Sequence, residues 1–227
     1  DELDQMKKIR DSLGNQFCRR CNYCAPCSAG ISIYGVLLME GYYNRYNLKE
    51  WATQRYNAMA KTASDCIDCG LCETRTNVVF GVGLKTADVM FIGEGPGEQE
   101  DIQGEPFVGK SGQLLDKYLE LIDLDRKKNI YIANMVKCRP PKNRDPLPEE
   151  QEQCIGWLRE QTRLIPPKII VCLGRISATR IISPDFKVTK QHGQFIEKNG
   201  TLMMGTFHPA ALLRNPNQKP DALEDFL

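Results

Sequence analysis

The chain has 227 residues, of which 41% are hydrophobic and 26% charged, as is usual for a soluble globular protein with one sizeable domain and a small appendage. No apolar run approaches the roughly 20 residues that a membrane-spanning helix needs, and the acidic first residues are unlike a secretory signal. We therefore expect a cytoplasmic protein that has no membrane partner.

Residues 1–65 are predicted to form a cysteine-rich N-terminal unit. Apolar residues at helical spacing indicate a helix over residues 3–13, and a second helix is expected over about residues 48–60. Between these helices lies a run of C-x-x-C spacings, and a shorter run follows at residues 66–72. Without a secretory signal, such runs indicate metal or cluster binding rather than disulfides. The cysteines of the two runs are Cys18, Cys21, Cys24, Cys27, Cys66, Cys69 and Cys72.

Residues 66–227 are predicted to form a second domain of alternating strands and helices. The strands are expected at residues 87–92, 130–133, 168–173 and 202–206, and the helices at residues 112–123, 148–164 and 176–182. This alternation predicts a three-layer α/β/α fold with a central, mostly parallel sheet. Functional sites of such sheets lie at the carboxyl ends of the strands, where Glu94, Asn134, Gly174 and His208 are found.

The charge balance is close to neutral, with 30 basic and 29 acidic residues, whereas most nucleic-acid-binding proteins are more basic. Such a chain can bind nucleic acid only if its cations gather on one surface. Residues 137–144, KCRPPKNR, contain four cations and no acid. We expect these cations to contact phosphates: Lys137, Arg139, Lys142 and Arg144.

A glycine-rich turn, GEGPG at residues 93–97, follows the first strand of the second domain. Glycines let the backbone approach a ligand closely, although a plain tight turn would have the same sequence. The following Lys110-Ser111 lacks the spacing of a Walker motif, so we do not predict a nucleotide-phosphate loop.

Three segments of the second domain resemble the motifs of family 4 uracil-DNA glycosylases. Residues 93–116, GEGPGEQEDIQGEPFVGKSGQLLD, are similar to the first motif, residues 134–146, NMVKCRPPKNRDP, to the second, and residues 208–214, HPAALLR, to the third. The resemblance extends from about Cys66 to the last residue. It implies a uracil-DNA glycosylase-like fold and an enzyme of base excision repair that hydrolyses the N-glycosidic bond of uracil in DNA.

The resemblance implies roles for residues of all three motifs. Phe107 matches the aromatic residue on which the base stacks. Asn134 matches the amide that donates to O4 and accepts from N3–H of uracil, a pattern that rejects cytosine. His208 matches the histidine at uracil O2, where it stabilises the departing anion. Glu94 matches the acidic residue of the first motif, and we assign it to positioning water or stabilising the sugar cation.

Further matches concern the pocket and the DNA. Gly95 would bring the backbone close to the base, and Asn143 would order the pocket. The base has to be flipped out of a duplex, and an apolar wedge can fill the space that it leaves. The loop that follows the histidine is predicted to enter the minor groove with Leu212, Leu213 and Arg214.

Each of these residues also has a plain structural interpretation. Phe107 can be a core aromatic residue, Asn134 a turn residue at a strand end, and His208 a structural histidine. The second histidine of the chain, His192, lies in a polar loop without a motif, and we expect a structural role for it.

Four cysteines match the cluster ligands of family 4, namely Cys66, Cys69, Cys138 and Cys154. Four thiolates suit either a [4Fe-4S] cluster or zinc, and the resemblance implies the cluster. Its expected role is structural, because it would hold the loop that follows Cys138.

Residues 1–75 resemble the C-terminal ferredoxin-like domain of some aldo/keto reductases. The segments CRRCNYCAPCSAGISI and ASDCIDCGLCETR are similar to its two cluster motifs, but Thr76-Asn77 stands where the second motif ends in Cys-Pro. A second cluster would use Cys18, Cys21 and Cys24, with Cys27 or Cys72 as fourth ligand. Zinc or free thiols are the alternatives.

We predict a monomeric, monofunctional glycosylase that uses water as the nucleophile, because no lysine occupies a motif position that suggests a Schiff base. One alternative is a module that binds uracil or an abasic site in DNA without turnover. Another is an iron–sulfur electron-transfer protein, which would leave the DNA motifs unexplained.

Overall fold

The computed structural model describes residues 49–227. The chain divides into two compact units, Asp1–Arg55 and Tyr56–Leu227. The helix predicted at residues 3–13 and the first cysteine run lie outside the described residues, so the predicted domain boundary at residue 65 remains a prediction. The helix predicted over about residues 48–60 is confirmed as α3, Lys49–Ser64.

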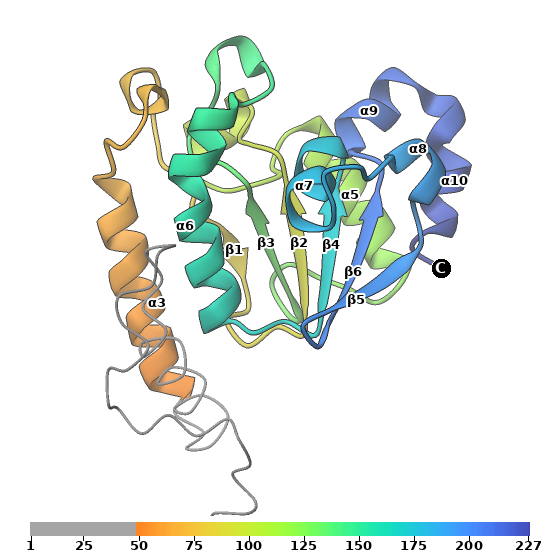
Figure 1. Cartoon of the computed structure of the whole chain (residues 1–227), viewed down its shortest axis with the longest axis horizontal. Coiled ribbons are helices and arrows are strands. Elements are labelled where there is room, and N and C mark those ends of the chain that lie inside the picture. The colour runs from red at the N-terminus through yellow and green to blue at the C-terminus, as the bar shows by residue number, and fades with distance from the viewer. Residues whose placement is uncertain (1–48) are drawn as a thin grey trace, which may run out of the picture. The chain divides into compact units, whose positions relative to one another are not determined.

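Six strands form one sheet within the described residues (Figure 1). The order is β1-β3-β2-β4-β6-β5, and the four central strands run parallel, which confirms the predicted mostly parallel sheet. The antiparallel edge strands β1 and β5 were not predicted. The strands are β1 (Val82–Gly83), β2 (Val89–Gly93), β3 (Ile130–Asn134), β4 (Ile169–Leu173), β5 (Phe195–Lys198) and β6 (Thr201–Thr206).

The helices of residues 66–227 alternate with the central strands, as predicted. The α-helices are α4 (Glu98–Gln103), α5 (Lys110–Glu120), α6 (Pro148–Leu164), α7 (Arg175–Ile181), α8 (Val188–Gln191), α9 (Pro209–Arg214) and α10 (Lys219–Glu224). Three short 3-10 helices are η3 (Gly70–Glu73), η4 (Pro141–Asn143) and η5 (Pro216–Gln218). None of the helices in residues 49–227 combines the length and apolarity that crossing a bilayer requires.

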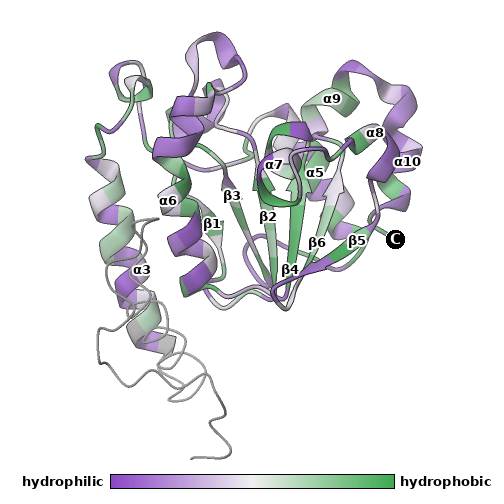
Figure 2. Ribbon diagram, viewed as in Figure 1, coloured by the Kyte–Doolittle hydropathy of each residue, from purple (hydrophilic) through white to green (hydrophobic). Residues whose placement is uncertain are grey.

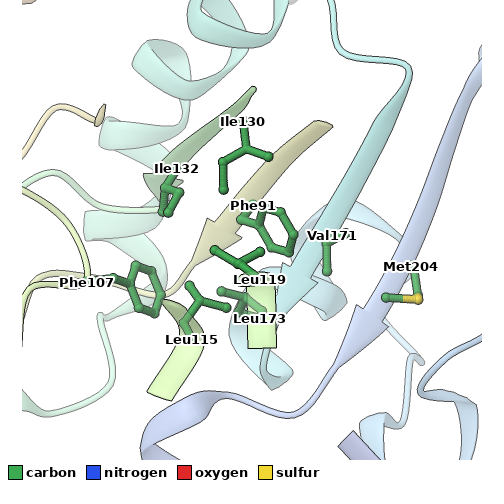
Figure 3. Close-up of a cluster of buried hydrophobic side chains, with 9 residues drawn as sticks. All are labelled: Phe91, Phe107, Leu115, Leu119, Ile130, Ile132, Val171, Leu173 and Met204. Carbon is green, nitrogen blue, oxygen red and sulfur yellow. The ribbon is translucent and has the colours of Figure 1, made fainter. Parts of the chain in front are cut away.

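The two faces of the sheet pack against different helices. On one face, Leu115 and Leu119 of α5 pack in a buried cluster with Phe91 and Val171 (Figure 3). Tyr131 points to the opposite face, where its hydroxyl accepts a hydrogen bond from Gln161 of α6 at 2.9 Å. The central strands are mostly hydrophobic, as strands covered on both faces must be (Figure 2). The predicted three-layer α/β/α architecture is therefore confirmed.

The parallel strands end together at one edge of the sheet. Gly93 and Asn134 are register partners at the ends of β2 and β3, and Leu173 pairs with Thr206 at the ends of β4 and β6. The loops that follow these strands therefore converge, and they carry the residues that the sequence singled out.

Candidate active site

A cleft of about 520 Å³ opens at the carboxyl ends of the parallel strands. Residues from all three sequence motifs line it, so segments more than 100 residues apart form one site. The predicted site residues that it brings together are Glu94, Gly95, Phe107, Asn134, Asn143, Arg144, His208, Leu213 and Arg214.

An aromatic ring and an amide meet at the base of the cleft because β2 ends in a glycine. A Cβ atom on Gly93 would lie 2.5 Å from Cζ of Phe107 and 2.4 Å from Oδ1 of Asn134. Phe107 itself has a positive φ of 55°, which is uncommon for a bulky residue. Arg126 supports this turn, because its guanidinium donates to the carbonyl oxygens of Pro106 and Phe107, both at 2.8 Å.

The amide of Asn134 is buried, and its Oδ1 atom has no hydrogen-bond partner among residues 49–227. A buried acceptor without a partner is costly, and such atoms often mark a binding site. Asn134 therefore presents an acceptor to a ligand that carries an N–H group.

His208 is held as a neutral imidazole. Its Nδ1 atom accepts a hydrogen bond from the backbone N–H of Ala210 at 3.1 Å, so the proton of the neutral ring lies on Nε2. Burial lowers the pKa of His208 to about 4, the cation of Arg214 lowers it further, and the carboxylate of Glu100 opposes the shift. The ring therefore stays neutral near pH 7 and keeps an N–H donor.

Glu94 carries a raised pKa of about 7. Burial is the largest cause, and the neighbouring carboxylate of Asp145, which shares a hydrogen bond with Glu94, adds to it. The cations of Arg175 and Arg214 oppose the shift, and Arg175 also pairs with Asp145 at 2.6 Å. This cleft thus holds a carboxyl group that changes its charge near neutral pH.

Sequence reasoning assigned no role to several residues that support the cleft. Glu100 is buried, and its Oε1 atom accepts hydrogen bonds from the backbone N–H groups of Val108 and Gly109 at 2.9 and 2.8 Å. Its position within the first motif could have drawn attention to it. Asp145 likewise stands within the second motif, whereas Arg126 lies outside all three motifs, 10 to 20 residues from its partners.

The predicted phosphate contact of Lys137 is wrong. Its side chain is only 2% exposed, and its ammonium group bonds inside the protein. The other cations of the segment are accessible to different degrees. Arg139 donates to Oδ1 of Asn143 at 2.8 Å, Arg144 forms two hydrogen bonds with Glu150, and Lys142 is exposed. For these three cations, contact with phosphate stays a prediction.

The prediction that Leu212 and Leu213 both enter the minor groove is wrong for Leu212. Leu212 is 1% exposed and packs in a buried cluster with Tyr118 and Phe207, so it cannot enter DNA. Leu213 is 41% exposed and lines the cleft beside the exposed Arg214. The tip of α9 therefore offers one apolar side chain rather than two.

His192 does not line this cleft. Its Nδ1 atom lies 2.8 Å from Oδ1 of Asp225, and its ring packs 4.7 Å from that of Phe207. Asp225 in turn accepts from the hydroxyl of Thr206, so His192 ties α8 and α10 to the end of β6. These contacts support the structural role expected for it.

Five cysteines line a second, small and largely apolar cavity together with Leu71 and Trp157. They are Cys66, Cys69, Cys72, Cys138 and Cys154. Two of the sulfur atoms accept hydrogen bonds, from Nη1 of Arg75 to Cys138 at 3.3 Å and from the backbone N–H of Lys137 to Cys154 at 3.2 Å.

The donor set of this cavity suits a thiolate-bound group. Burial raises the pKa of Cys154 to about 11 and also raises that of Cys138, so both thiols stay protonated near pH 7 unless a cation stabilises the thiolates. Within residues 49–227, no group of three or more His, Cys, Asp or Glu side chains is arranged to hold a single metal ion. By donor type and by their N–H···S bonds, the cysteines of this cavity are nevertheless compatible with a thiolate-bound cluster.

The chain is similar to known proteins over most of its length. Residues 80–227 match the family model of the Uracil DNA glycosylase superfamily. A type-4 uracil-DNA glycosylase of Archaeoglobus fulgidus is 43% identical over 71% of this chain and 84% of the relative. The type-4 enzyme of Sulfurisphaera tokodaii is 44% identical over 71% of this chain and 77% of the relative, and that of Thermotoga maritima is 41% identical over 76% and 87%.

Proposed function

This chain belongs to the uracil DNA glycosylase superfamily, and from its similarity to type-4 members and from its cleft we propose that it hydrolyses the N-glycosidic bond of uracil in DNA. One observation carries the proposal. Phe107 from the loop between α4 and α5, Asn134 from the end of β3 and His208 from the loop after β6 line one cleft that is large enough for a flipped base.

Recognition of uracil follows from the buried amide. The free Oδ1 atom of Asn134 can accept from N3–H of uracil, and its Nδ2 group can donate to O4. Cytosine presents an acceptor at N3 and a donor at N4, so it would leave both groups of the amide unpaired. The ring of Phe107 provides an apolar face on which the base stacks.

Departure of uracil leaves the bonding electron pair on the base, with negative charge spread to O2. The Nε2–H group of a neutral His208 can donate to this oxygen. Because the ring is already neutral and held by Ala210, no reorganisation is needed as the charge develops.

The sugar is left with positive charge, which an ionised Glu94 can stabilise while it orients a water molecule. The water oxygen bonds to C1′, and its proton passes to a carboxylate of the Glu94 and Asp145 pair. No amine takes part, so the reaction ends at an abasic site with an intact backbone.

The DNA partner would be held at the rim of the cleft. The exposed Leu213 at the tip of α9 would fill the space left by the flipped base, and the exposed cations Arg214 and Lys142 would contact phosphate. One open DNA face needs no second subunit, so we expect a monomer.

We propose that Cys66, Cys69, Cys138 and Cys154 hold a [4Fe-4S] cluster. The cluster would supply a rigid link between the segment before β1 and the loop after β3, and no electron transfer is required. The N-terminal cysteines lie outside the described residues. A second cluster on Cys18, Cys21 and Cys24, with Cys27 or Cys72 as fourth ligand, therefore remains a prediction.

The test is release of free uracil from a uracil-containing oligonucleotide by the full chain. We expect release by the parent and a loss of about 100-fold or more in His208→Ala and Asn134→Ala, as for removal of an oxyanion donor. His192→Ala is the matched control and should retain activity. Binding without release would indicate the non-catalytic module instead. A product trapped covalently by borohydride on Lys110, a lysine that lines the cleft, would contradict the water mechanism.

A further inference from the structure

The ammonium group of Lys137 is the buried charge that the proposed mechanism does not use. Nζ donates to the backbone oxygen of Asn134 at 2.8 Å and to Oε1 of Gln161 at 2.5 Å, and it lies 5.6 Å from the ring centroid of Phe80. Among residues 49–227, none of its partners is a carboxylate. Lys137 also lines the cysteine cavity, where Cys154 is its electrostatic partner, yet both of its side-chain hydrogen bonds go to neutral oxygens. Charge pairing alone therefore does not explain the bond to Asn134.

The partners of this ammonium group are themselves fixed. Gln161 is fully buried on α6, and its Nε2 group donates to the backbone oxygen of Phe80 at 2.8 Å and to the hydroxyl of Tyr131 at 2.9 Å. The amide orientation of Gln161 is thus set from two sides. Its Oε1 atom can only point toward Lys137, so the ammonium group is held at a defined place.

This fixed ammonium group bonds to the backbone of Asn134, the residue proposed to recognise the base. Asn134 is the last residue of β3, and the next residue already bonds to the neighbouring strand, from Met135 N to the oxygen of Gly93 at 2.9 Å. The peptide group between Asn134 and Met135 is thus held at both ends, because Lys137 donates to its oxygen and its N–H donates to Gly93. It therefore fixes the direction in which the amide of Asn134 leaves the backbone.

Resting on the proposed function, we propose that Lys137 is a positioning residue. Its buried ammonium group holds the backbone of Asn134 so that the amide meets the edge of the base, and it makes no contact with DNA phosphate. The backbone N–H of the same residue donates to the sulfur of Cys154, so one residue links the cysteine cavity to the base pocket.

The experiment compares Lys137→Met with Lys117→Met, a matched change at an exposed lysine of α5 that lines neither the cleft nor the cysteine cavity. For Lys137→Met we expect the single-turnover rate of uracil release to fall about 10-fold or more, because a charge-assisted hydrogen bond is lost. The affinity for duplex DNA and its salt dependence should stay at the parent values. Lys117→Met should leave both the rate and the slope of log affinity against log salt at the parent values.

A double-mutant cycle shows whether the effect runs through the amide. In the Asn134→Ala background, Lys137→Met should cost less than about 2-fold, because no side chain remains to be positioned. A full additional loss in this background would overturn the proposal, as would a parent-like rate or a reduced salt slope in Lys137→Met.

A second variant covers the case in which Lys137→Met does not fold, as judged by thermal unfolding. Gln161→Met removes the acceptor that holds the ammonium group and leaves the charge in place, and it should lower the rate without changing the salt slope. A parent-like rate in a folded Gln161→Met protein would then refute the positioning role. Absence of uracil release by the parent would refute the proposed function and not this inference.

Discussion

The ring of Phe107 lies 5.6 Å from the imidazole of His208, centroid to centroid, with the two planes 33° apart. A base stacked on Phe107 would therefore lie within reach of the imidazole. That arrangement suits a donor aimed at a carbonyl oxygen, and it makes the protonation state of His208 decisive.

We expect His208 to remain neutral with its proton on Nε2 from pH 5 to 8. Its pKa of about 4 lies below this range, and Ala210 occupies Nδ1. The measurement is ¹⁵N NMR of the imidazole nitrogens as a function of pH. The chain has two histidines, so His192→Ala assigns the spectrum. A His208 signal that titrates near pH 6.5 would contradict the proposed donor.

The rate of uracil release should rise with pH through about pH 7. The pKa of Glu94 is about 7, and a carboxyl group is ionised above its pKa, so the form that stabilises the sugar cation is lost as the pH falls. The measurement is kcat/KM between pH 5 and 9. The carboxyl groups and cations that act on Glu94 are Asp145, Arg175 and Arg214.

Two variants should move this profile in opposite directions. Asp145→Asn removes a negative charge that raises the pKa of Glu94, so the midpoint should shift to lower pH. Arg175→Met removes a cation that lowers the same pKa, so the midpoint should shift to higher pH. Shifts in the same direction, or none, would show that Glu94 does not set the profile.

Leu212→Ala and Leu213→Ala should have different effects although the residues are adjacent. Leu212 is buried, so its truncation should lower the free energy of unfolding by about 2–5 kcal/mol and leave the activity of the folded protein intact. Leu213 is exposed at the cleft, so its truncation should leave stability unchanged and slow uracil release from duplex DNA more than from single strands. Chemical denaturation and activity assays on both substrates test the pair.

Cysteine substitutions should separate the proposed ligands from their neighbour. Cys154→Ser and Cys138→Ser should remove the visible absorbance of an iron–sulfur cluster and lower the melting temperature, since a bound group stabilises the fold. Cys72→Ser changes a cysteine of the same cavity and should keep the absorbance if Cys72 is not a ligand. Zinc and no iron in the purified parent would contradict the cluster.

The central strands and their order along the chain could be predicted from sequence because they are short apolar runs that end in a glycine or a polar residue. The edge strands could not. β1 has two residues, and every residue of β5 is exposed, so neither carries an apolar pattern.

At the site, the type of a residue did not predict whether its side chain is buried. Lys137 stands in a cationic segment, yet the turn after β3 directs it inward, where Gln161 and a carbonyl oxygen receive it. Leu212 and Leu213 are identical in type, and only the helical phase of α9 decides which one faces the core. Arg126 escaped notice because its partners, two carbonyl oxygens and the carboxylate of Asp116, lie 10 to 20 residues away in the sequence.

The Oδ1 atom of Asn134, which has no hydrogen-bond partner among residues 49–227, affects how this protein can be stabilised. A buried acceptor without a protein partner, as this Oδ1 atom is within the described part of the chain, costs on the order of 1–3 kcal/mol, and a base with an N–H donor offsets that cost when it binds. An apolar residue of similar size at this position would remove that cost and the enzyme's ability to distinguish bases at once. Selection for thermal stability alone would thus favour loss of activity at this position. We interpret Asn134 as a residue that is kept for substrate recognition at a cost in folding stability.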